Sequence, residues 1–248
     1  MTGGDPARTM GFLEHFAELR LRVLLGLGGA MLCGLLAYIF VDPLYALLLR
    51  PLTLAAPGVQ LNYLSPVEPF YVDLKIALYT GVALGSPWLL YQLWLFIAPG
   101  LTPAERRAVR PVLPLIFVLF ILGVAFVYAF LLPVSMRFLM GMAHQGLAPM
   151  LTQDRYFGFV VGMCLGGGLI FELPVVLCLM GYLGLVSASF LWRHTGWAAV
   201  ILMTLAAVIT PTGDAFTMLV LTAPLLVLYL ASVILVWAIR RRIDKRAA

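Results

Sequence analysis

Two carboxylates on separate polar segments are the side chains of this chain that most directly suggest chemistry. Glu105 lies in the segment 91–107, where an apolar, aromatic stretch runs straight into a group of arginines, and Glu18 lies in a polar segment near residue 20. A carboxylate accepts guanidinium groups through two parallel hydrogen bonds, and charge-assisted bonds contribute roughly 1.5–3 kcal/mol each. If both segments face the same side of a membrane, they predict a receptor for a cationic, partly apolar peptide.

Each of these carboxylates also has an ordinary structural role open to it. Glu18 and Arg22 are four residues apart on a predicted helix, where an exposed ion pair contributes about 0.3–0.5 kcal/mol. Glu105 ends the sequence TPAE at 102–105, which is a capping box with proline at the first helical position. A carboxylate has about four acceptor positions, so capping and guanidinium binding can coexist at Glu105.

A third carboxylate, Glu172, interrupts the otherwise uncharged run 156–192. Deep in hydrocarbon, an ionised carboxylate costs several kcal/mol unless it is paired or hydrated, so such a residue is a functional candidate. We predict that Glu172 organises the docking of a partner helix. A proton relay, or a protonated glutamate bonded to a neighbouring helix, remains open as an alternative.

The composition places these carboxylates in an all-α, polytopic membrane protein. The chain is 63% hydrophobic and 11% charged, whereas a soluble domain has roughly 25% charged residues. A crossing needs about 20 apolar residues, and no stretch alternates with the period of two that a membrane barrel requires. The uncharged runs predict six transmembrane helices, at about 23–41, 75–97, 112–132, 156–181, 194–209 and 216–239.

The distribution of basic residues predicts the orientation of the spans. Of the 16 Lys and Arg residues, twelve fall on one side of the predicted membrane and four on the other. Because cytoplasmic loops carry the excess of positive charge, we expect both termini in the cytoplasm. A net charge of +5 suits an anionic lipid leaflet and does not require a nucleic acid partner.

The segments next to the spans carry further structural signals. Residues 9–22 predict an amphipathic helix that lies on the membrane surface before the chain turns into the first span. The segment 42–73, which contains Pro51, is so rich in proline that we expect short helical pieces covering the outer face. Three glycines at helical spacing predict close approach of a neighbouring helix: Gly158, Gly162 and Gly166.

Signals for enzymatic chemistry are lacking in the sequence. Neither lysine follows a glycine-rich phosphate-binding loop, and no Gly-x-Ser-x-Gly elbow is present. The three histidines lie on different segments without zinc-site spacing, and the three cysteines lie inside apolar runs. We therefore expect no catalytic residues, no metal site and no cofactor.

Six short motifs, in order along nearly the whole chain, resemble the TatC family, the multi-spanning subunit of the twin-arginine protein translocase. They are EHFAELRLR at 14–22, LRPL at 49–52, SPVEPF at 65–70, the segment 91–107, FELP at 171–174 and ITPTGD at 209–214.

The resemblance implies a receptor that binds twin-arginine signal peptides of folded cargo at the cytoplasmic face. It also implies assembly with itself and with TatA- and TatB-type single-span proteins, and export driven by the proton motive force across a bacterial or archaeal plasma membrane. It places Glu18, Arg20, Phe96 and Glu105 in signal-peptide binding. It places Glu172, Thr210 and Asp214 in partner docking within the membrane.

Simpler roles and rival functions remain open at this point. Phe96 could be a lipid or interface anchor, and Asp214 could only cap the sixth span. The rival functions are a proton-coupled transporter of a small solute, with Glu172 as its relay, and an intramembrane hydrolase. The hydrolase lacks a nucleophile–base pair.

Overall fold

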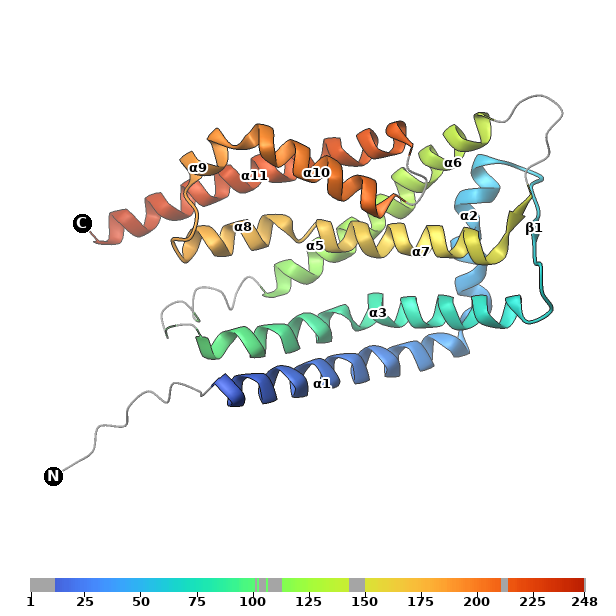
Figure 1. The fold of residues 1–248 in the computed structure, drawn as a ribbon, viewed down its shortest axis with the longest axis horizontal. Helices are drawn as coiled ribbons and strands as arrows, with labels where there is room; N and C mark the ends of the chain where they lie inside the picture. The colour runs from blue at the N-terminus through green and yellow to red at the C-terminus, as the bar shows by residue number, and fades with distance from the viewer. Residues whose placement is uncertain are drawn as a thin grey trace.

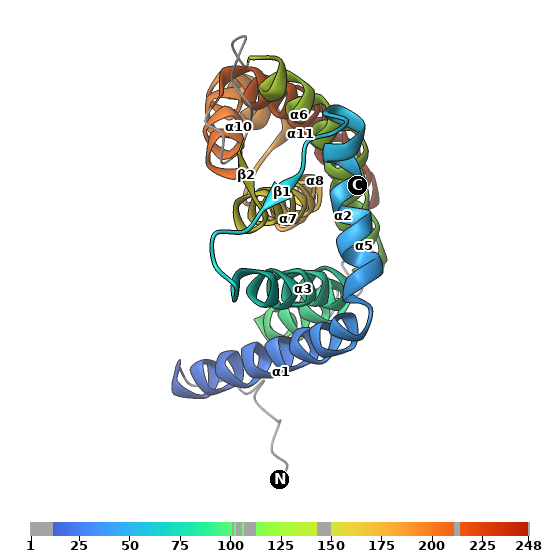
Figure 2. The ribbon, with the colours of Figure 1, turned by 90° about the vertical axis from the view of Figure 1, so that its right-hand side faces the viewer.

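The computed structural model of the protein describes residues 12–100, 102, 106, 113–142, 150–210 and 214–247. The chain is almost entirely helical (Figure 1). The long helices run nearly parallel or antiparallel to one another, and in the end view they form a curved wall (Figure 2). The helices are α1 (Phe12–Ile39), α2 (Val41–Ala55), α3 (Glu68–Ile97), α5 (Leu113–Phe126), α6 (Leu132–Gly141), α7 (Gln153–Ile170), α8 (Leu173–Tyr182), α9 (Ala188–Arg193), α10 (Thr195–Ile209) and α11 (Ala215–Ala247).

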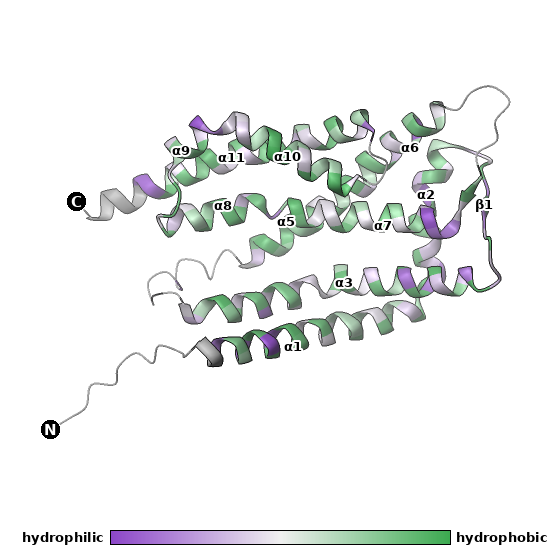
Figure 3. Ribbon diagram, viewed as in Figure 1, coloured by the Kyte–Doolittle hydropathy of each residue, from purple (hydrophilic) through white to green (hydrophobic). Residues whose placement is uncertain are grey.

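Five helical segments are long and apolar enough to cross a membrane: His15–Ile39, Glu68–Gly100, Pro114–Gly141, Gln153–Tyr182 and Ala215–Arg241. They agree with five of the six predicted spans. The remaining span corresponds to α10, whose 15 residues reach about 22 Å, short of a hydrocarbon core about 30 Å thick. Apolar residues run along the helices, and hydrophilic residues gather mostly toward the two ends of the bundle (Figure 3).

The predicted turn between an amphipathic surface helix (9–22) and the first span is wrong for the described residues. Helix α1 continues through residue 22 without a break. Nothing in 12–39 is a proline, and Trp88 Nε1 of α3 donates a hydrogen bond of 2.9 Å to the carbonyl oxygen of Leu25. The packing against α3 therefore begins near the predicted turn and favours one straight helix.

Small residues bring α1 and α3 into backbone contact. A methyl group added to Gly81 would lie 2.4 Å from Gly34 Cα, and one added to Gly85 would lie 3.0 Å from Ala30 Cα. At Gly81 even a methyl group would push the two backbones apart, and at Gly85 a methyl group would be at the limit of contact. The pair α1–α3 lies at one side of the curved wall (Figure 2).

The proline-rich segment contains one regular helix, α2, in which Pro51 is tolerated. Proline lacks an N–H group, so it leaves the carbonyl oxygen four residues earlier, that of Leu47, without its helical partner. The hydroxyl of Tyr128 donates to this oxygen at 2.7 Å, and the hydroxyl of Tyr156 donates to the Leu48 oxygen at 2.8 Å. Helix α3 begins at Glu68, so the predicted outer loop 42–73 extends too far into helical sequence.

Glu68 holds together the end of the bundle that carries α2. Its Oε2 accepts a hydrogen bond from Leu64 N at 2.7 Å, and its Oε1 accepts one from Asp154 N at 3.1 Å, at the start of α7. The Asp154 side chain pairs in turn with Lys75 of α3. Beside this network, the two-residue strands β1 (Leu61–Asn62) and β2 (Leu151–Thr152) pair in parallel, a small departure from an all-α fold.

The glycines of α7 only partly fulfil the predicted close approach. A methyl group on Gly166 would lie 2.6 Å from the Ile209 side chain of α10, and one on Gly167 would lie 2.2 Å from Val127. A methyl group on Gly162, by contrast, would meet no heavy atom of another described segment within 4 Å. A methyl group on Gly158 would meet only Lys75 Nζ, at 3.7 Å. Within the described chain, close helix contact therefore occurs at Gly166 and Gly167, and the prediction for Gly162 is wrong.

Candidate functional site

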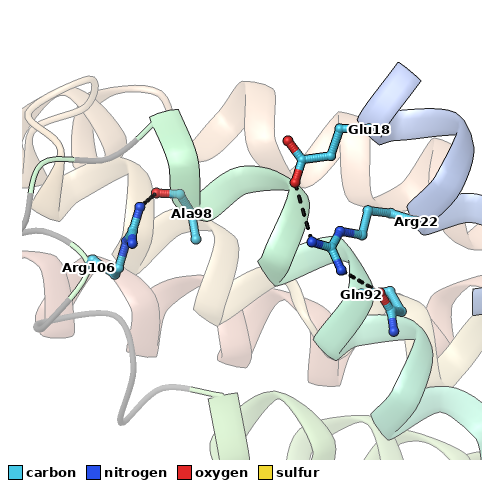
Figure 4. Close-up of polar contacts among 5 residues, drawn as sticks. All are labelled: Glu18, Arg22, Gln92, Ala98 and Arg106. Atoms are coloured by element: carbon cyan, nitrogen blue, oxygen red, sulfur yellow. Dashed lines mark hydrogen bonds and ion pairs between the residues drawn. The ribbon is translucent and has the colours of Figure 1, made fainter. Parts of the chain in front are cut away.

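A polar cluster joins α1 to α3 near the end of the bundle where α1 begins (Figure 4). Glu18 Oε1 lies 3.4 Å from Arg22 Nη2, so the i,i+4 ion pair allowed by the sequence is present. Arg22 Nη1 also donates a hydrogen bond of 3.4 Å to Gln92 Oε1 on α3. Gln92 is buried, and it links the charged pair on α1 to the neighbouring helix.

The Glu18–Arg22 pair retains unused hydrogen-bonding capacity. Glu18 Oε2 and Arg22 Nε are both buried and have no hydrogen-bond partner among the described residues. A buried polar atom without a partner is unfavourable by about 1–3 kcal/mol, and by more in a charged group. The Glu18 side chain as a whole is 14% exposed, but its second oxygen is buried, so a donor can reach that oxygen only if neighbouring side chains move.

An aromatic pair lies beside the carboxylate. The rings of His15 and Phe96 are stacked, with centroids 4.4 Å apart and an interplanar angle of 21°. His15 precedes Glu18 by three residues and Phe96 follows Gln92 by four, so each ring shares a helix face with a member of the polar cluster. Phe96 is thus not only a lipid-facing anchor, because it takes part in a contact between α1 and α3.

Arg106, which follows α3 in the chain, contacts the end of that helix. Arg106 Nη2 donates a hydrogen bond of 2.7 Å to the carbonyl oxygen of Ala98, in the short helix η1 (Ala98–Gly100) (Figure 4). Arg106 N also bonds to Thr102 O at 2.9 Å, the spacing of a helical turn that starts at the predicted cap. Arg20 is exposed. Glu105 lies outside the described residues, so its role stays a prediction.

Gln92 is the member of this cluster that the sequence interpretation missed. It is the only amide in the apolar run 76–104, which is the signal that could have identified it. A buried amide in a membrane helix needs a hydrogen-bond partner. The partner, Arg22, lies 70 residues away in the chain, and no local pattern indicates it.

Glu172 occupies a break between α7 and α8. The break is explained by Pro174, which has no N–H group to donate to the carbonyl oxygen of Ile170. The Glu172 residue is 7% exposed, and neither carboxylate oxygen has a hydrogen-bond partner within the described chain. Glu172 is therefore a buried acidic group among apolar helices, and no described residue donates a hydrogen bond to its carboxylate oxygens.

Thr210 and Asp214 lie at the connection between α10 and α11. Thr210 is buried, and its hydroxyl donates to the Ala206 oxygen at 2.8 Å. Asp214 Oδ1 accepts a hydrogen bond from Thr217 N at 2.7 Å, so it caps α11 as the simpler role predicted. Neither side chain bonds to Glu172, although Ile209 brings the end of α10 onto α7.

The described residues do not form a metal site. In the described ranges, no group of three or more His, Cys, Asp or Glu residues is placed to hold a metal ion. Two candidate binding regions remain: the α1–α3 cluster, with an oriented carboxylate, and the Glu172 break, with an isolated one.

Comparison with known proteins identifies the family. The family model described as "Sec-independent protein translocase protein (TatC)" matches residues 14–224. The chain belongs to the TatC family. The TatC protein of Carboxydothermus hydrogenoformans is 34% identical over 226 residues, which cover 91% of this chain and 92% of that protein. The TatC protein of Koribacter versatilis is 36% identical over 237 residues, covering 92% and 86% respectively.

The fold agrees with a solved TatC structure. The crystal structure described as "Twin Arginine Translocase Receptor- TatC" superposes with a TM-score of 0.79 at 33% identity, covering 91% of this chain and 99% of that chain. The protein is therefore a membrane component of a Sec-independent protein translocase, a role that implies other translocase subunits and cargo. TatC proteins are translocase components and not enzymes, which confirms the expectation of no catalysis and sets aside the hydrolase and the small-solute transporter.

Proposed function

We propose that this TatC protein is the receptor subunit of a twin-arginine translocase and binds twin-arginine signal peptides at the cytoplasmic face. The observation that carries the proposal is the buried Glu18 Oε2, which has no hydrogen-bond partner among the described residues. A guanidinium group is the donor that matches a carboxylate in geometry and charge. Arg22 already occupies Oε1, so a signal arginine would take the free oxygen.

The neighbouring groups suit the rest of such a peptide. The stacked His15 and Phe96 rings offer an aromatic surface for an apolar residue or for the face of a second guanidinium group. Glu105, which lies outside the described residues, is proposed to receive the second arginine, and Arg20 to border the site. In this proposal Arg22 and Gln92 orient Glu18 and do not touch the peptide.

The arrangement of the chain ends supports a cytoplasmic placement of this cluster. In Figure 1 the start of α1 and the end of α11 lie at the same end of the bundle. Five crossings would separate them across a bilayer, whereas α10 as a sixth crossing returns them to one side. The excess of Lys and Arg predicted for that end supports its placement on the cytoplasmic side of a bacterial or archaeal plasma membrane.

Glu172 is proposed to dock a single-span partner of the TatA or TatB type, together with the region of Thr210 and Asp214. A partner helix that offers a hydroxyl or amide could donate to the carboxyl group that has no donor within the described residues. The short α10 would leave the bilayer thinned beside it, which favours covering by a partner helix. Export would then draw on the proton motive force, with no nucleotide or metal cofactor.

Photocrosslinking tests the receptor function directly. A signal peptide with a photoactivatable residue beside its two arginines should crosslink to α1 and to the segment after α3. The same peptide with two lysines should crosslink much less, because a compact, strongly hydrated ammonium group lacks the planar fork and the aromatic stacking of a guanidinium group. Equal crosslinking of the arginine and lysine peptides would contradict the proposal.

A further inference from the structure

An apolar pocket lies away from both candidate sites, where α2, α3, α5 and α7 meet. Its volume is about 350 Å³, within the roughly 300–1,000 Å³ range of small-ligand pockets. Val161 and Cys164 of α7 are buried and form its floor, while Leu84 of α3 and Ala125 of α5 are exposed at its rim. The lining is almost wholly apolar, so the occupant is a hydrocarbon group.

The α2 end of the pocket is different, because it carries polar and charged groups. Leu47 lines the pocket there, and its carbonyl oxygen is bonded to Tyr128, a second lining residue. Arg50 follows Leu47 by three residues on α2, so the two side chains are neighbours on the helix surface. Arg50 is exposed and interacts electrostatically with the Tyr128 hydroxyl.

Arg50 has no acidic partner within the described chain, where the ion pairs are Arg22–Glu18 and Lys75–Asp154. A positive charge one helical turn from a residue that lines a hydrocarbon pocket matches a molecule with an anionic head and an apolar tail. In a membrane, the abundant molecule of that chemistry is an anionic glycerophospholipid.

We propose that this pocket binds one acyl chain of an anionic phospholipid, whose phosphate pairs with Arg50. The lipid belongs to the leaflet at the α2 end of the bundle. The acyl chain would fill the space between α3 and α5, and the phosphate would hold α2 at the membrane surface through Arg50. The inference is independent of the proposed signal-peptide and partner sites, since none of their residues line the pocket.

Native mass spectrometry of the purified full-length protein tests the headgroup part. Offered equal amounts of phosphatidylglycerol and phosphatidylcholine, the protein should retain phosphatidylglycerol preferentially. Arg50→Gln should lower that preference about fivefold, the change that corresponds to the roughly 1 kcal/mol contributed by one arginine near anionic lipid. The matched control is Arg137→Gln, which removes an exposed arginine of α6 that does not line the pocket.

Photocrosslinking with a diazirine-bearing acyl chain tests the pocket itself. Crosslinks should concentrate on the lining segments of α3, α5 and α7. Ala125→Trp, which fills the rim from an exposed position, should remove them, whereas Ala231→Trp on the exposed surface of α11 should not. Three results would overturn the proposal: an unchanged lipid preference in Arg50→Gln, crosslinks spread evenly over all helices, or crosslinking of a partner helix at Ala125 in place of lipid.

Discussion

Glu18 and Glu172 are both acids with a buried carboxylate oxygen that lacks a partner in the described chain, yet their surroundings differ. Glu18 is held by Arg22, which is held in turn by Gln92. Glu172 lies at a helix break with both oxygens unbonded. An acid that is bonded to a neighbouring cation is held in one orientation, so it suits a charged ligand. An isolated acid in hydrocarbon suits a neutral hydrogen-bond donor.

The two regions also differ in the contacts that position each carboxylate. The contacts of Arg22 with Gln92 and of His15 with Phe96 exist only because α1 and α3 touch, whereas Glu172 is placed by the local effect of Pro174 within one polypeptide segment. Substitutions can therefore disable one region and spare the other.

The largest effect is expected from Gly81→Leu. The new side chain would collide with the backbone of α1 near Gly34, and overpacking of this kind costs about 1–3 kcal/mol or more. Separation of α1 from α3 would remove Gln92 from Arg22, lower the melting temperature in detergent and abolish signal-peptide crosslinking. Partner crosslinks at Glu172 should persist.

Gly162→Leu is the matched control for this substitution, because no described heavy atom lies within 4 Å of a methyl group at Gly162. Its melting temperature should stay close to that of the unaltered protein. Gly81→Ala should show the same losses as Gly81→Leu in milder form. If Gly81→Leu and Gly162→Leu lose peptide crosslinking equally, the prediction that signal-peptide binding depends on the contact between α1 and α3 is wrong.

Glu18→Arg should weaken signal-peptide binding by about tenfold or more, since one charge-assisted bond of roughly 1.5–3 kcal/mol is replaced by repulsion. Titration of a fluorescent signal peptide against the purified protein measures this loss. Asp42→Arg, which makes the same charge change at an exposed position of α2, is the control and should bind normally. If Glu18→Arg binds the signal peptide normally, the role of Glu18 is only to form an ion pair with Arg22 on the surface of α1.

At Glu172 a smaller and chemically different response is expected. Glu172→Gln keeps the hydrogen bond to a partner helix, while Glu172→Ala loses a bond contributing about 0.5–1.5 kcal/mol, or roughly two- to tenfold in partner affinity. Site-specific crosslinking of the partner along α7 and α8, with export measured in parallel, follows both variants. If both variants lose export equally while crosslinks are unchanged, Glu172 relays protons and does not dock a partner.

The sequence predicted the helices well because a membrane crossing is a property of composition over about 20 residues. The cap at Asp214 could be inferred from a short polar side chain just before a span, which is a local effect. The break at Glu172 was not predicted, although Pro174 is the local signal for it. The continuity of α1 was not predictable in this way, because an amphipathic helix and a span share the same period. The contact of Trp88 with Leu25 decided between them.

Tertiary contacts account for the remaining differences. Glycines at helical spacing occur in several spans, and the sequence does not indicate which of them meet a neighbour. A methyl group on Gly81 would collide with Gly34, whereas one on Gly162 would meet no heavy atom of another described segment within 4 Å. In the candidate site, the acid Glu18 could be identified by its chemistry, but the orienting role of Gln92 required the position of α1 against α3.

The smallest effect is expected from Gln92→Leu, which tests whether the orientation of Glu18 matters. The substitution removes a long hydrogen bond of 3.4 Å to Arg22 and keeps the side chain at a similar size. The loss of one weak bond corresponds to about 0.5 kcal/mol, or roughly twofold in signal-peptide affinity. Peptide titration measures it, and partner crosslinks at Glu172 should not change.

A double-mutant cycle separates orientation from a general loss of packing. If Gln92 acts on the peptide only through Arg22 and Glu18, Gln92→Leu should have no further effect in the Glu18→Arg background. An additive loss in the double variant would mean that Gln92 contacts the peptide directly or supports the fold. In that case the contrast between an oriented acid at Glu18 and an isolated one at Glu172 would have to rest on Arg22 alone.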